Sequence, residues 1–364
     1  MYYIIHIDTA KTWRGGQQQV AYLHEGLIDK GIKSLVVCPP ESRLKKWCVD
    51  HQLPYTSLPL KGEYDLYSAY QLAKIIPQKN KTILHAHDAH ALMIALWVDV
   101  FAKKTPSIVA SRRVDFPLKG NKIRQLKYQT PRLDKIICIS QAILRIMQAH
   151  DIPDDKLTVI PSGIDIHKFD AISRDKTFWD TFGIPQNHRI VSTVAALTGH
   201  KDYPNLLEAA AVVLQKYPAV TFVIVGNGEQ ADAIHALTEG KGLKDHVIFT
   251  GFRTDVGYFL KNSDLFVLPS KKEGMGTSIL DAEAAGLPVI GTDAGGIPEV
   301  IRHEQNGLIV PKQNPEALAN AILSLLENDK KRQAFGQKSL DVVRDFDIKL
   351  TIKKHITLYE TILK

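Results

Sequence analysis

The chain has 364 residues, 45% of them hydrophobic and 23% charged, which is the composition of a soluble globular protein with room for two domains. Cys38, Cys48 and Cys138 form no CxxC pair, which argues against a disulfide framework or a zinc site and for a reducing compartment. The first residues lack the basic segment of a signal peptide, and the longest apolar run, residues 91–102, is too short to span a bilayer. We therefore expect a cytoplasmic protein that does not cross a membrane.

The basic residues are concentrated in the first half. The first 170 residues hold 24 Lys and Arg against 16 Asp and Glu, whereas the remainder hold 22 against 23. Residues 103–135 form either a solvated basic face or a surface that binds anionic headgroups or a phosphorylated acceptor at a membrane. No nucleic-acid-binding motif accompanies the charge, so we expect no nucleic acid partner. The residues expected on this surface are Arg112, Arg113, Lys119, Lys122, Arg124 and Lys127.

Short apolar runs alternate with helix-length amphipathic stretches along the whole chain. The runs are residues 2–7, 34–39, 82–87, 107–111, 135–140 and 157–161 in the first half, and 189–195, 220–226, 247–251, 265–270, 288–292 and 307–310 in the second. This rhythm predicts two doubly wound, Rossmann-like α/β domains with parallel sheets, 1–168 and 169–345, with a hinge in the polar segment 165–188. Ligands bind at the carboxyl ends of such strands, so we expect the active site in a cleft between facing domains.

Two motifs stand at the ends of predicted strands in the first half. Gly15 and Gly16 lie where a strand turns into a helix, so backbone N–H groups can approach an anion there, although a plain tight turn has the same sequence. His85 and His87 alternate onto one face of the third strand, which suggests a metal site. No set of further ligands follows the later strands, so a histidine that makes a polar contact in the active site is the preferred interpretation.

Loops after strands of the second half carry weaker and stronger signals. Lys201 precedes an amphipathic helix, where it can meet a phosphate or simply face solvent. Gly226 and Gly228 lie at the turn after the next strand and are weak evidence alone.

The stretch EGMGTSILDAEAAG, residues 273–286, places two acids around a bare loop. Its glycines allow the N–H groups of residues 274–278 to converge on a diphosphate. Glu273 can accept hydrogen bonds from hydroxyl groups, and Asp281 lies one to two turns into the following helix. A ligand that touches both acids, with its phosphates between them, has the chemistry of a nucleotide sugar. The alternative is that the two acids only cap the N-terminus of the helix and bind no ligand.

These motifs resemble those of the family 4 (group 1) glycosyltransferases, which are retaining enzymes of GT-B architecture. The resemblance covers nearly the whole chain and includes WRGGQQQV, HAHD, IPSGIDIHKF, VGNGE, FTGFRTDV and the run LPSKKEGMGTSILDAEAAGLPVIGTDAGGIPEVI, which is its most specific part. It implies that residues 346–364 form a last helix that returns to the first domain. It also implies that no metal and no cofactor is needed besides a nucleotide-diphosphate sugar as co-substrate.

The resemblance further implies roles for single residues. Glu273 would bind the donor sugar, Asp281 the ribose, and Phe252 and Arg253 would lie near the base. Lys201 would hold the diphosphate together with backbone N–H groups. The implied catalytic residues are Glu273, His87 and Lys201, and the implied donor-binding residues are Gly15, Gly16, Gly226, Phe252, Arg253, Gly274, Met275, Gly276, Thr277, Ser278 and Asp281.

Two positions depart from the family pattern. Asp281 replaces the usual glutamate and is one methylene shorter, and Ala196 occupies the place of an arginine that many members carry upstream of the phosphate-binding lysine. Arg189, Arg253 or a basic residue of the first domain would have to replace that arginine.

We therefore expect a retaining hexosyltransferase whose acceptor is a glycan or glycolipid. Lipopolysaccharide core or another glycolipid is the preferred acceptor for two reasons: the region 103–135 is basic, and WRGGQQQV and SRRVDFPL resemble segments of cell-envelope transferases. Three alternatives stay open: a nucleotide-sugar epimerase or hydrolase on the same scaffold, a metallohydrolase built on His85 and His87, and a sensor that binds the donor without turnover.

Overall fold

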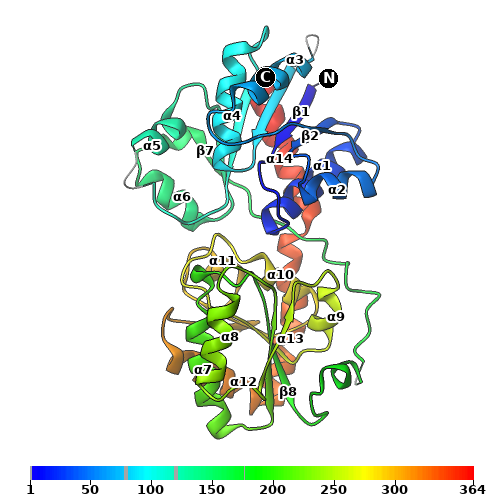
Figure 1. The fold of residues 1–364 in the computed structure, drawn as a ribbon, viewed down its shortest axis with the longest axis vertical. Helices are drawn as coiled ribbons and strands as arrows, with labels where there is room; N and C mark the ends of the chain where they lie inside the picture. The colour runs from blue at the N-terminus through cyan, green and yellow to red at the C-terminus, as the bar shows by residue number, and fades with distance from the viewer. Residues whose placement is uncertain (1, 78–80, 119–121, 176) are drawn as a thin grey trace. The chain divides into compact units, whose positions relative to one another are not determined.

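The computed structural model describes residues 2–77, 81–118, 122–175 and 177–364, and only the backbone of residues 122–124. The chain forms two compact units (Figure 1): unit 1 comprises Met1–Gly163 and Ile348–Lys364, and unit 2 comprises Ile164–Asp347. Each unit is an α/β structure with one parallel sheet. The segment 165–188, predicted as the hinge, belongs to unit 2, and its described residues, 165–175 and 177–188, contain no strand.

Unit 1 has a seven-stranded sheet in the order β3–β2–β1–β4–β5–β6–β7, with all neighbouring strands parallel. The strands are β1 (Tyr2–Ile7), β2 (Lys33–Cys38), β3 (Tyr55–Ser57), β4 (Lys81–Ala86), β5 (Ser107–Arg112), β6 (Lys135–Cys138) and β7 (Leu157–Val159). The helices are α1 (Gly15–Asp29), α2 (Arg43–Asp50), α3 (Leu66–Ile75), α4 (Ala89–Phe101), α5 (Lys122–Gln129), α6 (Gln141–Gln148), the short η1 (Asp154–Lys156) and α14 (Ile348–Leu363).

The C-terminal helix α14, red in Figure 1, is part of the core of unit 1. Tyr359 of this helix is fully buried against Ile4 of β1 and Ile83 of β4. Gly26 of α1 allows the two helices to approach, because a Cβ atom there would lie 2.3 Å from Ile352 of α14. The last residues of the chain therefore complete the apolar core that the first residues begin.

Unit 2 has a six-stranded sheet in the order β10–β9–β8–β11–β12–β13, again with all neighbouring strands parallel. The strands are β8 (Arg189–Val194), β9 (Val220–Val225), β10 (Val247–Gly251), β11 (Leu265–Leu268), β12 (Val289–Thr292) and β13 (Gly307–Val310). The helices are η2 (Phe178–Phe182), η3 (Gly199–Lys201), α7 (Tyr203–Lys216), α8 (Ala231–Gly240), α9 (Val256–Lys261), α10 (Thr277–Ala284), α11 (Ile297–Val300), α12 (Pro315–Leu326), α13 (Asp329–Val342) and η4 (Val343–Phe346).

Two kinds of helix start matter for the sites below. Asp88 caps α4 by accepting hydrogen bonds from the backbone N–H groups of His90 and Ala91, both at 2.9 Å. Such a cap satisfies N–H groups that the first turn of a helix leaves without partners. In contrast, α10 begins at Thr277, and its N-cap residue Gly276 provides no side-chain cap and has a φ angle of +83°, which favours glycine. The first N–H groups of α10 are thus open to a ligand.

Neither unit contributes a membrane span: among the described residues, no helix combines the length and the hydropathy needed to cross a bilayer.

Candidate functional site

In unit 2, two of the three residues implied as catalytic lie together at the carboxyl ends of β8 and β11. These strands are neighbours where the strand order reverses, which is where doubly wound sheets bind ligands. The Lys201 ammonium, in η3 after β8, forms an ion pair with the Glu273 carboxylate in the loop after β11. Ser270 Oγ donates to the same carboxylate at 3.1 Å. Each side chain of the ion pair is 14% exposed, so a ligand at this edge can reach both groups.

The loop between Glu273 and α10 has little side-chain bulk on the ligand side. Gly274, Met275 and Gly276 are all buried, and the Met275 side chain belongs to the core, so only backbone atoms of these residues are offered to a ligand. Because α10 lacks a side-chain cap, the N–H groups of Thr277 and Ser278 keep the positive end of the helix dipole accessible. This arrangement suits a phosphate group.

Asp281, on α10, has a partner that sequence reasoning missed. Lys168 Nζ lies 2.5 Å from Asp281 Oδ1, and the two side chains are 18% and 17% exposed. Lys168 also lies 4.8 Å above the ring of Phe169. The ion pair holds one carboxylate oxygen of Asp281, the acid that replaces the usual glutamate. It also places the cation of Lys168 at the edge of the sheet where the family arginine is replaced by Ala196.

Three further residues implied in donor binding lie at the same edge of unit 2, whereas Gly15 and Gly16 lie at the start of α1 in unit 1. Gly226 follows β9, and a Cβ atom there would lie 2.0 Å from the Ala195 carbonyl oxygen, so this glycine is required for loop packing even without a ligand. Phe252 follows β10 and is 49% exposed. Arg253 is exposed beside it and donates to the Asp255 carboxylate at 2.8 and 2.6 Å.

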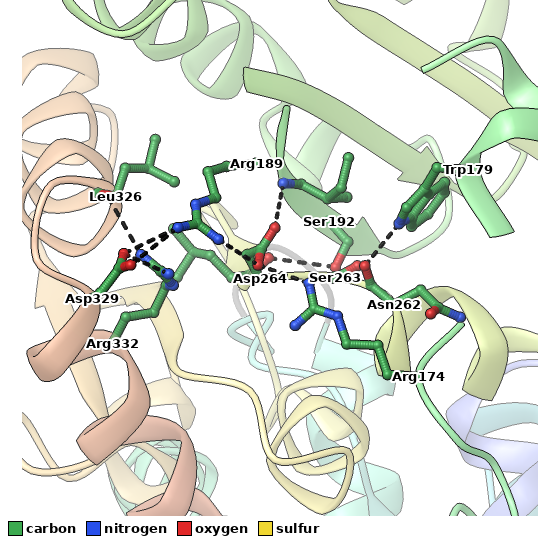
Figure 2. A network of polar contacts seen from close by, with 12 residues as sticks. Arg174, Trp179, Arg189, Ser192, Asn262, Ser263, Asp264, Leu326, Asp329 and Arg332 are labelled. Carbon is green, nitrogen blue, oxygen red and sulfur yellow. Dashed lines mark hydrogen bonds and ion pairs between the residues drawn. The ribbon is translucent and has the colours of Figure 1, made fainter. Parts of the chain in front are cut away.

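Arg189 cannot replace the arginine missing at Ala196, and this prediction is wrong. Arg189 begins β8 and therefore lies at the amino edge of the sheet, opposite the site. Figure 2 shows its guanidinium between Asp264 and Asp329, at 3.6 Å and 3.1 Å. Arg174 donates to the same Asp264 carboxylate at 2.8 Å. This network therefore holds the 165–188 segment against the sheet of unit 2 and has a structural role.

In unit 1, polar residues gather at the carboxyl ends of β1, β4 and β5. Arg113 Nη2 lies 3.4 Å from His87 Nδ1, and the buried Arg113 Nε has no hydrogen-bond partner among the described residues. The Cδ atom of Arg113 lies 3.6 Å from the position of a Cβ on Gly16, so its side chain packs against the N-terminus of α1. Burial lowers the pKa of Arg113 to about 10, which leaves it charged at neutral pH. A partly buried guanidinium with an unused Nε–H donor suits an anionic ligand group.

A carboxylate lies on the same edge. Asp8, after β1, accepts hydrogen bonds from Gln17 Nε2 at 2.9 Å and from the Ala10 N–H at 3.0 Å. Burial, together with the neighbouring Asp88 carboxylate, raises the pKa of Asp8 to about 6. The sequence analysis did not identify Asp8, although its position directly after a buried strand was a signal.

His85 and His87 lie on one face, as strand alternation predicts, with ring centroids 4.0 Å apart. His6, 81 residues before His87, joins them: its Nδ1 lies 2.9 Å from His87 Nε2. All three rings are buried, and burial holds the pKa of each well below the usual value, so they are neutral at neutral pH. Sequence reasoning missed His6 because its proximity depends on the pairing of β1 with β4.

The three histidines have the composition of a metal site, and their ligand atoms lie within 4.8 Å of one another. Three contacts weigh against this interpretation. Both ring nitrogens of His85 are already hydrogen-bonded, Nδ1 with the Tyr359 hydroxyl at 2.7 Å and Nε2 with Ser111 Oγ at 2.8 Å. The Arg113 guanidinium beside His87 would repel a cation. The geometry fits a hydrogen-bonded histidine cluster better than a metal centre.

The basic surface predicted for residues 103–135 is wrong for two of its six residues. Arg112 is 7% exposed and donates to the Phe116 carbonyl oxygen. The Lys127 side chain is 3% exposed and pairs with the Glu63 carboxylate at 2.6 Å. Arg112 is thus held by its own loop, whereas the partner of Lys127 lies 64 residues away. Lys119 lies outside the described residues, as do the side chains of Lys122 and Arg124, while Arg113 lies in the site itself.

Two family models match the chain. The model described as "Glycosyl transferases group 1" matches residues 175–341, and the model described as "Glycosyltransferase Family 4" matches residues 13–168. The first contains Lys201, Glu273 and Asp281, and the second contains Gly15, Gly16 and His87.

The chain is also similar to characterised proteins over most of its length. N-acetyl-alpha-D-glucosaminyl L-malate synthase of Bacillus anthracis is 25% identical over 310 residues, which cover 83% of this chain and 80% of that protein. UDP-Gal:alpha-D-GlcNAc-diphosphoundecaprenol alpha-1,3-galactosyltransferase of Escherichia coli is 27% identical over 315 residues, which cover 81% of this chain and 79% of that protein.

Solved structures share the fold at lower identity. HepE of Anabaena, solved in complex with UDP and glucose, superposes with a TM-score of 0.87 at 20% identity and covers 99% of this chain and 100% of that chain. Sucrose-phosphate synthase of Thermosynechococcus elongatus superposes with a TM-score of 0.81 at 17% identity, over 100% of this chain and 99% of that chain.

Proposed function

Because the chain belongs to the group 1 and family 4 glycosyltransferases of GT-B architecture, we propose that it transfers a sugar from a nucleoside-diphosphate sugar to an acceptor hydroxyl group, with retention and without a metal ion. The observation that carries this proposal is the Lys201–Glu273 ion pair beside the uncapped N-terminus of α10. A cation and free N–H groups next to a carboxylate match a ligand that joins a diphosphate to a polyhydroxyl ring.

The donor binds along the carboxyl edge of unit 2. Lys201 and the N–H groups of Thr277 and Ser278 hold the diphosphate, where negative charge grows as the bond to the sugar breaks. Glu273 accepts hydrogen bonds from sugar hydroxyls and holds the anomeric carbon in attack geometry. Asp281 accepts from the ribose through the carboxylate oxygen that Lys168 does not engage.

Transfer proceeds by attack on the face from which the leaving group departs. The bond between the anomeric carbon and the diphosphate oxygen breaks, and a bond to the acceptor oxygen forms on the same face. The acceptor proton passes to the departing diphosphate oxygen. No covalent nucleophile is invoked, since Glu273 is committed to Lys201 and to the sugar.

The acceptor binds to unit 1, and it carries an anionic group. Support comes from Arg113, whose buried Nε is unpartnered beside His87 and the N-terminus of α1. The names of two relatives point the same way, since one contains L-malate and the other a diphosphoundecaprenol-linked sugar. We propose a lipid-linked or otherwise anionic cell-envelope glycan, glycosylated at the cytoplasmic face of the membrane.

A second candidate, hydrolysis at a metal held by His6, His85 and His87, is favoured only by the gathering of these rings. The hydrogen bonds of His85 and the nearby Arg113 disfavour it. The two candidates differ in their response to a chelator.

Thermal unfolding with a panel of UDP, GDP, ADP, CMP and their sugar conjugates, each with and without EDTA, tests the donor site. A nucleotide at about 100 times its dissociation constant should stabilise the fold by about 2.7 kcal/mol. We expect a shift with one nucleoside diphosphate that EDTA does not change. No shift with any nucleotide, together with a lower unfolding temperature in EDTA, would support the histidine-metal candidate instead.

A test variant and its matched control locate the bound nucleotide. Lys168→Ala should reduce the nucleotide-induced shift, and it should also reduce the preference for the ribonucleotide over its 3′-deoxy analogue, because Asp281 loses its partner. Lys331→Ala is the matched control: Lys331 pairs with Glu304 at 2.9 Å and lies 5.2 Å above the Phe335 ring, but it lies on α13, away from the carboxyl edge. Equal shifts in both variants would contradict the placement of the ribose at Asp281.

A further inference from the structure

Large apolar side chains are exposed along one side of unit 1. Tyr64 and Val100 are each 68% exposed and Tyr67 is 61% exposed, values that are high for aromatic and aliphatic residues. They lie on or beside α3 and at the end of α4. The α3–α4 patch consists of Tyr64, Leu66, Tyr67, Tyr70, Ile75, Val100 and Phe101.

The patch is one continuous surface. Helix α3 buries Ser68, Ala69, Leu72 and Ala73, and its opposite face carries the exposed residues. The rings of Tyr70 and Phe101 lie edge to face with their centroids 5.8 Å apart, which joins α3 to the end of α4. Trp97 Nε1 donates to the Glu63 carbonyl oxygen at 3.0 Å, which joins the same two segments near the start of α3.

The charges around the patch are unequal. Lys74 lies 4.2 Å above the Tyr70 ring, and Lys61, Lys103 and Lys104 are exposed at the ends of the two helices. The acids of these segments have partners within the fold: Asp65 caps α3, Glu63 pairs with Lys127, and Asp99 pairs with Arg132 at 2.5 Å. The patch therefore presents tyrosine and aliphatic side chains with an excess of lysine.

We propose that the α3–α4 patch docks unit 1 on an anionic lipid bilayer. Tyrosine rings are favoured at the membrane interface, where the ring is buried and the hydroxyl stays wet, and lysine stems extend so that their ammonium groups reach lipid phosphates. A symmetric contact with a second copy would bring the lysines of both copies together, which disfavours that occupant. This docking surface differs from the basic region predicted from the sequence, two of whose residues are buried.

The proposed function explains why the protein would bind a membrane, and the inference rests on it in that respect alone. Helices α3 and α4 follow β3 and β4, so their starts lie at the carboxyl edge of the sheet, which also holds His87 and Arg113. Their ends, with Lys74 and Phe101, lie at the amino edge. A bilayer that covers the patch would reach the carboxyl edge, where we place the anionic group of the acceptor, at the Tyr64 end of the patch. Binding to lipid is measured without donor or turnover, so its failure is distinguishable from failure of the proposed function.

Cosedimentation of the full chain with vesicles tests the proposal. We expect binding to phosphatidylcholine vesicles that contain about one third phosphatidylglycerol, weak binding to phosphatidylcholine alone, and loss of binding as NaCl rises from about 0.1 to about 0.5 M. The variant Tyr67→Ser/Tyr70→Ser/Phe101→Ser should lower the partition coefficient by at least about tenfold. Tyr258→Ser is the matched control, because Tyr258 is 49% exposed on α9 of unit 2, and it should bind like the parent.

A second variant separates charge from apolar contact. Lys74→Glu/Lys103→Glu should reduce binding to anionic vesicles and leave the weak binding to neutral ones unchanged. The proposal is overturned if the parent protein does not sediment with anionic vesicles, or if the triple serine variant binds as tightly as the parent. It is also overturned if light scattering shows a dimer that the triple variant dissociates while neither protein binds lipid.

Discussion

Replacement of Glu273 by alanine is expected to lower kcat/KM for sugar transfer by at least about 100-fold, since the donor sugar loses the carboxylate that holds it in attack geometry and Lys201 loses the partner that positions it. The loss should appear in kcat as well as in KM, because orientation matters most in the transition state. Initial rates over a range of donor and acceptor concentrations measure both constants.

Loss of fold is the rival explanation for an inactive Glu273→Ala protein. Leaving Lys201 unpaired at 14% exposure costs about 1–3 kcal/mol of folding free energy. The double variant Lys201→Ala/Glu273→Ala removes both charges and should recover part of that stability without recovering transfer. Glu304→Ala breaks an ion pair on the amino side of unit 2 and should transfer normally. Near-normal transfer by Glu273→Ala would sink the assignment.

Acid is expected to unfold unit 1 before unit 2. The five buried histidines among the described residues, His6, His24, His85, His87 and His355, all belong to unit 1. Burial lowers the pKa of His24 and of His355 to about 4, and that of the other three well below the usual value. The unfolded chain therefore binds more protons than the folded one between about pH 6.5 and about pH 4, so stability is lost as the pH falls through that window.

The size of the effect follows from the shifts. At about pH 5, His24 and His355 each remove about 2 kcal/mol of stability relative to neutral pH, and the other three act in the same direction. Asp8 opposes them, since its raised pKa makes the folded form bind more protons below about pH 6, which returns about 1 kcal/mol. The net result is a steep loss of stability for unit 1.

Hydrogen exchange measured by mass spectrometry from about pH 8 to about pH 5 follows each unit separately. After correction for the intrinsic exchange rate, peptides of β1, β4 and α14 should lose protection at a higher pH than peptides of unit 2. His24→Gln should flatten the pH dependence of unit 1, because one buried imidazole no longer takes up a proton on unfolding. Protection that falls equally in both units would contradict this account.

The strands were predictable because burial on both faces leaves an apolar run in the sequence. All twelve predicted runs are strands. Within the residues that the structure describes, the one strand missed is β3 (Tyr55–Ser57), which has three residues and lies at the edge of its sheet. A strand this short, which pairs on one side only, leaves no apolar run to recognise.

The positions of Glu273 and Lys201 were predictable, because each lies in a loop or turn directly after a strand that the sequence marks. A contact that joins distant segments of the chain was not predictable. Lys168 and Asp281 are 113 residues apart, and Lys127 and Glu63 are 64 apart, so neither the partner of Asp281 nor the burial of Lys127 leaves a local signal. Arg189 was misplaced although the sequence held the signal: it is the first residue of the run 189–195, so it lies at the end of β8 opposite the site.

Acceptor-dependent release of the nucleoside diphosphate is the most direct test of the central claim, that this chain is a metal-independent glycosyltransferase. The protein is incubated in EDTA with the sugar conjugate of the nucleotide that stabilises it, with and without a lipid-diphosphate-linked sugar as acceptor. We predict that release requires the acceptor and that each nucleotide released matches one sugar added with its anomeric configuration retained. Release at the same rate without acceptor, or release that EDTA abolishes, would contradict the account.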